Sequence, residues 1–591
     1  MLTYRRSLRL MSILLALLLL ITACGQNSND SASSTSGDVS APKNAIEVSI
    51  IYAPESDLYM PDVISDFNRA YANGTNPLTG EKLAQGERPI FVTGKSGSSG
   101  TVMQGIVNAV IAPQNQNVER PTIFEPSVSH WLALANYQSG REMFDLANSP
   151  ATANAPVVMA IWESRLNAIK QKYPGEAIGW KQLLDVLNSP NGWADFGIKD
   201  GRRTVYYGHT DPYISSTALS TLIAEYYASA LYNANFSGQR LTMAMVTDPA
   251  VQQGVRDIEG LIRHYSRRTT EFKEYIAQGP DYLDFVALEE NDLIYINQGK
   301  TEVKPPERLV ALYPAEGTFW HEHPFGIVQA DWVTDEQASA ARTFADYVRT
   351  PLVQEQIMAA GFRPVNPEVT LGYPFVPELG VDKDQPSTVL FVPDPAVISA
   401  IQENWSYVKK QADIWIVFDT SGSMQGDKLA QAKQAALLFL DNTELQNRVG
   451  LITFNSGIYV DVPMDSLETN KGALEETIQS LNAEQNTALY DALIEAVDMF
   501  GEGVSDDNRI RAIVLLSDGA DTASTQQIRD AKAVIESRRG DLNPVIVIPV
   551  AYGSDADIQT LNSIARSSAT KVQSGDPSNI SQLLELISSY F

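Results

Sequence analysis

The chain has 591 residues, with 44 lysine and arginine residues against 71 aspartate and glutamate residues, and its formal net charge is −27. So acidic a surface disfavours binding to nucleic acid or to anionic lipid, because both partners are themselves negatively charged. The sequence contains one cysteine, which excludes an intramolecular disulfide. Stability must therefore come from hydrophobic cores, and the length is ample for two or three domains.

The first residues predict a targeting segment. Three arginines among the first nine residues precede an apolar run over 11–21, which is short for a transmembrane span. The run leads into Leu-Ile-Thr-Ala-Cys, which resembles the lipobox of bacterial lipoproteins with Cys24 as the acylated residue. The resemblance implies a signal peptide over 1–23 and acyl chains such as palmitate, which would anchor the protein to the extracytoplasmic face of a membrane. Residues 24–43 are rich in Ser, Asn, Asp, Thr and Gly, and we expect a flexible tether there.

Strands and helices alternate between residues 44 and 395, which predicts an α/β fold. Apolar segments at 46–52 and 89–93 have the character of strands, and a helix with one apolar face is expected over 60–72. Taken in order, these segments resemble an extracellular solute-binding protein of the type II periplasmic class. That resemblance implies two α/β lobes that enclose a cleft.

The lobe boundaries follow from two segments that resemble the crossings between lobes in that class. One is the apolar run 157–163, and the other is 309–314. The expected division is lobe one at 44–155 and 315–395, and lobe two at 156–314.

In such an architecture the ligand groups come from loops that face the cleft. Several Ser and Thr clusters precede expected helices, where backbone N–H groups and the positive end of the helix dipole could hold an oxyanion or a carboxylate. The alternative, left open by the sequence, is that these hydroxyls only cap their helices. The candidates are Ser98, Ser99, Thr101, Ser127, Ser129, Ser215, Ser216 and Thr217.

The sequence does not assemble a catalytic site. His321-Glu322-His323 is dense in zinc ligands, but it lacks the i, i+4 spacing of a helical zinc motif and is followed by Pro324. The five histidines form no recognisable triad with serine and aspartate. We therefore expect a binding protein and not an enzyme.

The last third of the chain predicts a separate domain. A helical linker is expected over 396–411, with the domain over 412–591. Apolar runs at 414–418 and 513–516 are typical of buried parallel strands, and each is followed by a polar loop. Helices with one apolar face come next, so we expect a doubly wound, Rossmann-like α/β fold. Folds of this kind bind ligands outside the carboxyl ends of their strands.

Five polar residues fall at that end of the predicted sheet. The DxSxS sequence of Asp419, Ser421 and Ser423, with the later Thr487 and Asp518, resembles the von Willebrand factor A family and its metal-ion-dependent adhesion site. The resemblance implies that these residues hold Mg²⁺, with Mn²⁺ or Ca²⁺ as alternatives, while an Asp or Glu of a protein partner fills an open coordination position. Hydroxyls and carboxylates suit this role, because a hard cation prefers six oxygen ligands.

One departure from the family concerns the loop before Thr487. Gln485 and Asn486 stand where the family usually has glycines. Their side chains could crowd the ion, so Thr487 is the ligand in question.

The sequence is compatible with two functions. The first is a lipid-anchored, extracytoplasmic adhesion protein that engages a protein partner through Mg²⁺. The alternative is the solute-binding receptor of an ABC-type importer, with a small anionic or polar solute between the lobes and the C-terminal domain as an appendage.

Overall fold

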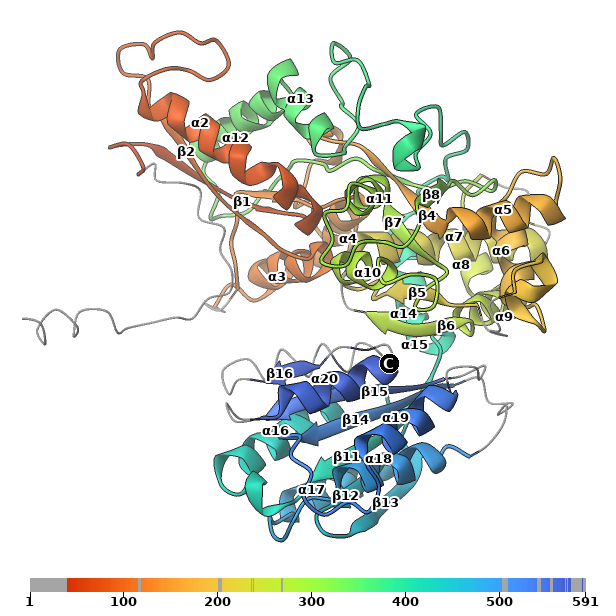
Figure 1. Ribbon diagram of the computed structural model, residues 1–591. Helices are drawn as coiled ribbons and strands as arrows, with labels where there is room; N and C mark the ends of the chain where they lie inside the picture. Colours follow the sequence, from red (N-terminus) through yellow and green to blue (C-terminus); the bar gives the residue numbers. More distant parts are fainter. Residues whose placement is uncertain are drawn as a thin grey trace, which may run out of the picture.

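The computed structural model describes residues 40–114, 118–199, 205–234, 236, 239–266, 269–501, 509–538, 544–552, 556–568, 570, 572–575 and 587. The predicted signal peptide, Cys24 and the predicted tether up to residue 39 lie outside this part of the chain. Within the described residues, no helix combines the length and apolar character needed to cross a membrane. Three sheets divide the described chain into two lobes and a C-terminal domain (Figure 1).

Lobe one is built on a four-stranded sheet of order β10-β3-β1-β2, in which β10 alone runs antiparallel to its neighbour. Alternate residues of β1, among them Val48 and Ile50, share a buried core with Phe67 of α2 and Phe344 of α12. The elements are β1 (Ile46–Tyr52), η1 (Pro54–Leu58), α2 (Met60–Ala72), β2 (Ile90–Ser96), α3 (Ser99–Ile111), β3 (Ile123–Glu125), α4 (His130–Ser139), η2 (Leu146–Asn148), β10 (Gly326–Ile327), α12 (Asp335–Val348) and α13 (Pro351–Ala359).

Lobe two is built on a sheet of order β6-β5-β7-β4-β8, with β9 paired to β4. All eight residues of β4 are buried, as expected for the apolar segment at which the chain enters the second lobe. The elements are β4 (Ala155–Trp162), α5 (Glu163–Lys172), α6 (Trp180–Leu187), η3 (Gly192–Phe196), β5 (Tyr207–Thr210), α7 (Ser216–Asn233), α8 (Met243–Val246), α9 (Pro249–Glu259), β6 (Ile262–Ser266), α10 (Thr269–Ile276), β7 (Phe285–Glu289), α11 (Glu290–Asn297), β8 (Leu309–Leu312), β9 (Trp320–His321) and η4 (Pro377–Leu379).

The last part of the segment assigned to lobe one lies against lobe two instead. Phe375 and Val381 bury their side chains in the core of lobe two, beside Leu309. Arg363 pairs with Glu290 of α11 at 2.7 Å. The predicted boundary of 315–395 is therefore wrong beyond about residue 362, because the apolar side chains around β8 need cover that this segment supplies.

The connector to the C-terminal domain is two short helices, α14 (Pro395–Glu403) and α15 (Trp405–Val408). The prediction of one helix over 396–411 is wrong, because the helix ends at Asn404, whose side-chain amide donates to the carbonyl of Ala400 at 3.0 Å. The apolar residues of this segment, among them Ile398, Ile401 and Val408, are buried in the same core as α4 and α7. The connector is therefore packed onto the lobes and does not stand free of them.

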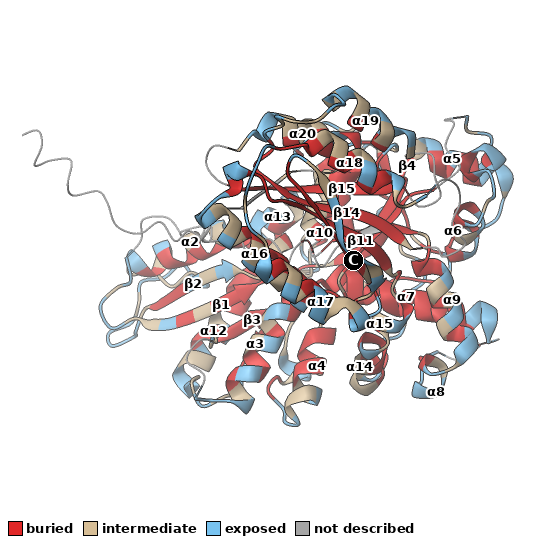
Figure 2. Ribbon diagram, turned by 90° about the horizontal axis from the view of Figure 1, so that it is seen from below, coloured by how far each residue is buried: buried red, intermediate tan, exposed pale blue. Residues whose placement is uncertain are grey.

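The C-terminal domain has a sheet of order β13-β12-β11-β14-β15-β16, parallel except for β13. Ile416 of β11 faces the core formed with α16 and α17, whereas Val417 faces the core formed with α18, α19 and α20. Figure 2 shows these two groups of helices on opposite sides of the strands, which confirms the predicted doubly wound fold. The elements are β11 (Ala412–Asp419), η5 (Gly422–Met424), α16 (Asp427–Asn442), β12 (Arg448–Phe454), β13 (Ile458–Ser466), α17 (Leu467–Ser480), α18 (Leu489–Asp498), β14 (Ile510–Ser517), α19 (Ile528–Ser537), β15 (Val545–Tyr552), α20 (Ile558–Ser567) and β16 (Gln573–Gly575).

Lobe two and the C-terminal domain meet at the end of the connector. Lys410 donates its backbone N–H to the hydroxyl of Tyr265 at 2.8 Å and its ammonium to the carbonyl of Ile262 at 3.0 Å. Arg256 of α9 lies 4.4 Å from the ring centroid of Tyr407 on α15. Burial lowers the pKa of Lys410 to about 7. These contacts fix how the C-terminal domain leaves lobe two.

Candidate functional site

The DxSxS loop and the Asp518 loop begin side by side because β11 and β14 are adjacent parallel strands. Phe418 is paired with Leu516 in their register, so Asp419 and Ser517 are the next residues along. The hydroxyl of Ser517 donates to Asp419 Oδ2 at 2.6 Å and accepts the backbone N–H of Gly519 at 3.0 Å. The two loops are thus joined at the carboxyl edge of the sheet.

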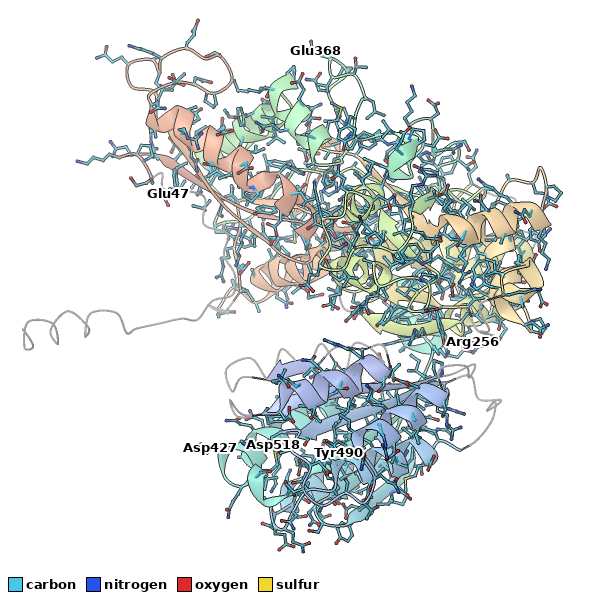
Figure 3. The ribbon with its side chains drawn as sticks, viewed as in Figure 1. Glu47, Arg256, Glu368, Asp427, Tyr490 and Asp518 are labelled. Atoms are coloured by element: carbon cyan, nitrogen blue, oxygen red, sulfur yellow. The ribbon has the colours of Figure 1, made fainter. Side chains whose placement is uncertain are left out.

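The loop of Thr487 joins them through backbone hydrogen bonds. The N–H of Gly422 donates to the carbonyl of Gln485 at 3.0 Å. On the other side, the N–H groups of Thr522 and Ala523 donate to the carbonyl of Thr487 at 2.9 and 2.8 Å. The fold therefore brings all three predicted loops together. In Figure 3, Asp518 lies at the end of the C-terminal domain that is remote from the connector.

The candidate ligands differ in how far they are exposed to solvent. Asp419 and Ser421 have no exposed surface, and Thr487 and Asp518 are 3% and 4% exposed. Ser423 is exposed, and its hydroxyl oxygen lies 3.0 Å from that of Ser421. The constellation is therefore buried on its inner side and open to solvent on the side of Ser423.

Hydrogen bonds and one ion pair hold the two aspartates of this site in place. Asp419 Oδ1 accepts the backbone N–H of Ser421 at 2.9 Å. Burial, which outweighs the hydrogen bonds from Ser421 and Ser517, raises the pKa of Asp419 to about 6. The Lys428 ammonium lies 3.2 Å from Asp518 Oδ2. The site thus places two carboxyl groups at one edge of the sheet, one of them already paired with the Lys428 ammonium.

Sequence reasoning missed Ser517 and Lys428. Ser517 had a usable signal, because it directly precedes Asp518 at the end of an apolar strand. Lys428 had none, since its position depends on how α16 turns back over the sheet edge.

The loop before Thr487 explains why glycine is usual there. Gln485 has a φ of 69°, in the left-handed region that side chains disfavour. The side chains of Gln485 and Asn486 are nevertheless exposed. They point into solvent, so the predicted crowding at Thr487 is not present in this conformation.

The interlobe region brings together five of the eight predicted hydroxyl residues. Ser98, Ser99, Ser127, Ser215 and Ser216 line one cavity of about 20 Å³, beside the carboxyl group of Glu55. Thr101, Ser129 and Thr217 are not part of its lining. A cavity of this size holds about one water molecule.

The hydroxyls around this cavity already bond to protein groups. Ser127 donates to Glu55 at 3.2 Å, Ser215 lies 2.8 Å from the hydroxyl of Thr269, and Ser216 accepts from Trp131 at 2.9 Å. Burial raises the pKa of Glu55, and the charge of Glu289 adds to this effect. The predicted anion site in the cleft is therefore not formed in this conformation, because the lobes are closed there and these hydroxyls already bond to protein groups.

A buried network of charged groups lies at the junction of the lobes. His323 Nδ1 is 3.2 Å from Glu125 of lobe one, and its Nε2 is 3.4 Å from Glu289 of lobe two. His321 contributes a 2.6 Å contact with Glu289. These side chains have no exposed surface. The His-Glu-His segment, set aside as a zinc motif, thus supplies the imidazoles that bridge the two lobes.

These contacts shift the pKa values of the histidine and its partner in opposite directions. Burial alone would lower the pKa of His323, but hydrogen bonds and charges from Glu125 and Glu289 outweigh it and raise the pKa to about 10. Burial would raise the pKa of Glu289, but His321 and His323 lower it to about 2. The shifts favour a protonated His323 beside an ionised Glu289, whereas burial raises the pKa of Glu125.

Comparison with known families decides the nature of the C-terminal part. Residues 413–585 match the von Willebrand factor type A domain family. The C-terminal domain is a von Willebrand factor type A (VWA) domain. Its matched range begins one residue into β11 and includes all three loops of the candidate site.

The curated relatives share only part of their length with this chain. Inter-alpha-trypsin inhibitor heavy chain H3 of Rattus norvegicus is 21% identical over 331 residues, which cover 54% of this chain and 37% of that protein. Heavy chain H2 of Sus scrofa is 25% identical over 178 residues, or 29% of this chain and 19% of that protein. The chain spans less than two fifths of the length of these relatives.

Solved structures resemble each half separately. A von Willebrand factor type A protein from Catenulispora acidiphila matches with 22% identity and a TM-score of 0.28, covering 31% of this chain and 42% of that one. A periplasmic thiamin binding protein matches with 12% identity and a TM-score of 0.41, covering 62% of this chain and 98% of that one. The two-lobed architecture itself follows from the strand pairing described above.

Proposed function

We propose that this chain is a lipid-anchored, extracytoplasmic binding protein whose VWA domain engages a protein partner through a bound Mg²⁺ ion. The observation that carries the proposal is the 3.0 Å separation of the Ser421 and Ser423 hydroxyl oxygens. Adjacent ligands of an octahedral ion with bonds of about 2.1 Å are also about 3.0 Å apart. The donor set of hydroxyls and carboxylates fits Mg²⁺, with Mn²⁺ or Ca²⁺ as alternatives.

Each residue has a defined part in this proposal. Ser421, Ser423 and Thr487 would hold the ion through their hydroxyls, and Asp419 and Asp518 would act directly or through water. The ion would supply a positive charge that neutral hydroxyl ligands leave largely uncompensated. A carboxylate of the partner could then approach from the side of Ser423, which is exposed. Binding of this kind needs no catalytic group, and we propose no enzymatic activity.

Membrane attachment is the other part of the proposal. Its support is the segment 20–24, which follows the apolar run and resembles a lipobox ending at Cys24. This segment lies outside the described residues. Metabolic labelling with an alkyne analogue of palmitate, comparing the native chain with Cys24→Ala, tests it. Label on the native chain alone is expected, and equal labelling of both would contradict the anchor.

Isothermal titration of the full chain with Mg²⁺ tests the metal site. Asp419→Ala and Ser421→Ala should remove the binding heat, while Ser480→Ala, at the exposed end of α17, should not. Partner recognition is tested with immobilised peptides that carry a central Glu or, as the control, Gln. Mg²⁺-dependent retention on the Glu peptides that EDTA abolishes is expected. Equal retention in EDTA would contradict the mechanism.

A receptor for a small solute is the second candidate. It is favoured by the convergence of five predicted hydroxyl residues on one cavity. Burial raises the pKa of the nearby Glu55 carboxyl group to about 8, so this group is mostly protonated near neutral pH and can donate to a polar or anionic solute. A thermal-shift screen with sugars, amino acids and oxyanions tests this candidate, and an unchanged thermal midpoint with all of them would contradict it.

A further inference from the structure

A cluster of potential metal ligands lies in lobe two, and none of its residues lines the interlobe cavity. His209 comes from β5, Glu225 from α7, and Glu259 from the last position of α9. One ligand atom from each lies within 4.8 Å of the others, and all three residues are buried. Three elements within a span of about 50 residues therefore bring three potential ligands to one point in the core.

Each of the three side chains is held by one atom and turns a second atom toward the others. His209 Nδ1 lies 2.6 Å from the carbonyl of Thr210, Glu225 Oε1 accepts from Tyr207 at 3.1 Å, and Glu259 Oε2 accepts from Tyr265 at 2.7 Å. Among the described residues, His209 Nε2 has no hydrogen-bond partner, and Glu225 Oε2 and Glu259 Oε1 have no donor unless one carboxyl group is protonated and bonds to the other. Leaving such polar atoms unpaired in a core is costly.

The tautomer of His209 follows from this arrangement. Because Nδ1 is used as the donor to the Thr210 carbonyl, Nε2 carries a lone pair. A histidine whose other nitrogen donates to a backbone carbonyl is the usual arrangement for a metal ligand.

We propose that His209, Glu225 and Glu259 form a buried site for one divalent transition cation, with zinc as the best match. Imidazole nitrogen suits zinc, iron, nickel and copper, whereas a site for Mg²⁺ or Ca²⁺ would be made of oxygen alone. Two carboxylates balance the charge of a divalent ion, so the loaded site is neutral, as burial requires. The ligand atoms, which lie within 4.8 Å of one another, would have to draw together, since ligands of tetrahedral zinc are about 3.3 Å apart.

The site would stabilise the connector to the VWA domain. The ring of Trp405 on α15 lies over His209, with 5.3 Å between centroids. Tyr265 donates to Glu259 and accepts the backbone N–H of Lys410, two residues before β11. An ion bound by Glu259 and His209 would therefore hold both surfaces against which the connector packs.

A proton shared by Glu225 and Glu259 is the competing explanation. Burial, together with the charge of Glu259, raises the pKa of Glu225 well above its usual value. In that case Glu225→Gln would replace the shared proton by an amide donor and keep or increase stability. If an ion is bound, the same change removes one ligand and one compensating charge.

The test is metal analysis of the full chain in the Asp419→Ala background, which removes the proposed VWA ion. After dialysis against zinc and gel filtration, mass spectrometry should find about one zinc per chain, and below about 0.1 in His209→Ala and Glu225→Gln. Tyr265→Phe should lower zinc affinity about 10- to 100-fold without removing a ligand.

A second readout does not depend on the variants folding. Cobalt added to the metal-free Asp419→Ala protein should give a visible absorption band that zinc removes, and zinc should raise the thermal midpoint. Protein that takes up no zinc, shows no cobalt band and has an unchanged midpoint would overturn the proposal in favour of the shared proton.

Discussion

The backbone N–H of Gly100 donates to the carbonyl of Ile214 across the junction of the lobes, at 3.1 Å. Gly100 is the second residue of α3 in lobe one, and Ile214 lies just before α7 in lobe two. A main-chain bond of this kind requires close contact, and the lobes are therefore closed at the point where the sequence predicted a ligand site.

Replacing Gly100 tests this closure. A Cβ at Gly100 would lie 1.9 Å from the carbonyl oxygen of Tyr213, so Gly100→Ala must separate the lobes locally. We expect a loss of about 1–3 kcal/mol in the free energy of unfolding. Gly105→Ala is the matched control on the same helix, where a Cβ meets no atom within 4 Å, and it should gain about 0.5–1 kcal/mol. Equal stabilities in chemical denaturation would argue against a closed junction.

The bridge at His323 predicts a pH dependence of stability. Its pKa is raised from 6.5 to about 10 in the folded chain, so the folded state holds this proton more tightly. The stabilisation is complete below about pH 6.5 and is lost as the pH rises toward 10. The groups that face it are Glu125, Glu289 and Asp292.

Lys410 acts in the opposite direction over a similar range. Its pKa is lowered from 10.5 to about 7, so its contribution to stability rises with pH. The measurement must therefore be the difference in thermal midpoint between the native chain and His323→Gln at each pH. This difference should shrink from pH 6.5 to 10, and a constant difference would show that His323 is not charged.

Ser517 orients Asp419 without being a predicted ligand. Removing its hydroxyl in Ser517→Ala leaves Asp419 Oδ2 without the 2.6 Å donor. We expect Mg²⁺ affinity to fall about 10- to 100-fold, measured by isothermal titration of the full chain. Ser480→Ala is the surface control, and an unchanged affinity in Ser517→Ala would separate this hydroxyl from ion binding.

Gln485 keeps a left-handed backbone at a position where glycine is the usual residue. Gln485→Gly should raise stability by up to about 1 kcal/mol, because glycine removes the steric cost of a positive φ. Asn486→Gly, whose φ is not positive, should lower stability slightly through the entropy of the unfolded chain. Denaturant titration of the two variants measures both effects, and the same sign for both would contradict the assignment.

The metal loops of the VWA domain could be predicted from sequence because their placement follows from local structure. Asp419 and Asp518 each follow an apolar parallel strand, and the carboxyl ends of adjacent strands meet at one edge. The break at Asn404 could not be predicted, since a continuous apolar spacing runs through it. Trp405, which begins the second helix, packs its ring against that of His209, a contact that the sequence does not show.

The groups between the lobes were beyond sequence reasoning for a different reason. Glu125 and Glu289 lie 164 positions apart in the sequence. Each is the last residue of its strand, β3 or β7. Their contact with His323 depends on the angle at which two lobes close. Five hydroxyl residues were placed at the correct junction, but whether that junction holds a ligand or a network of internal bonds is decided by the closure itself.

The direction of β11 has a mechanical consequence. This strand starts two residues after Lys410, which is bonded to lobe two, and ends at Asp419, about 25 Å away for its eight residues. It is flanked on both sides by parallel neighbours. A pull applied at Asp419 and resisted at Lys410 therefore runs lengthwise through the middle of the sheet. The load therefore passes along the covalent backbone of β11 itself, and the hydrogen bonds to its two neighbours do not have to carry it.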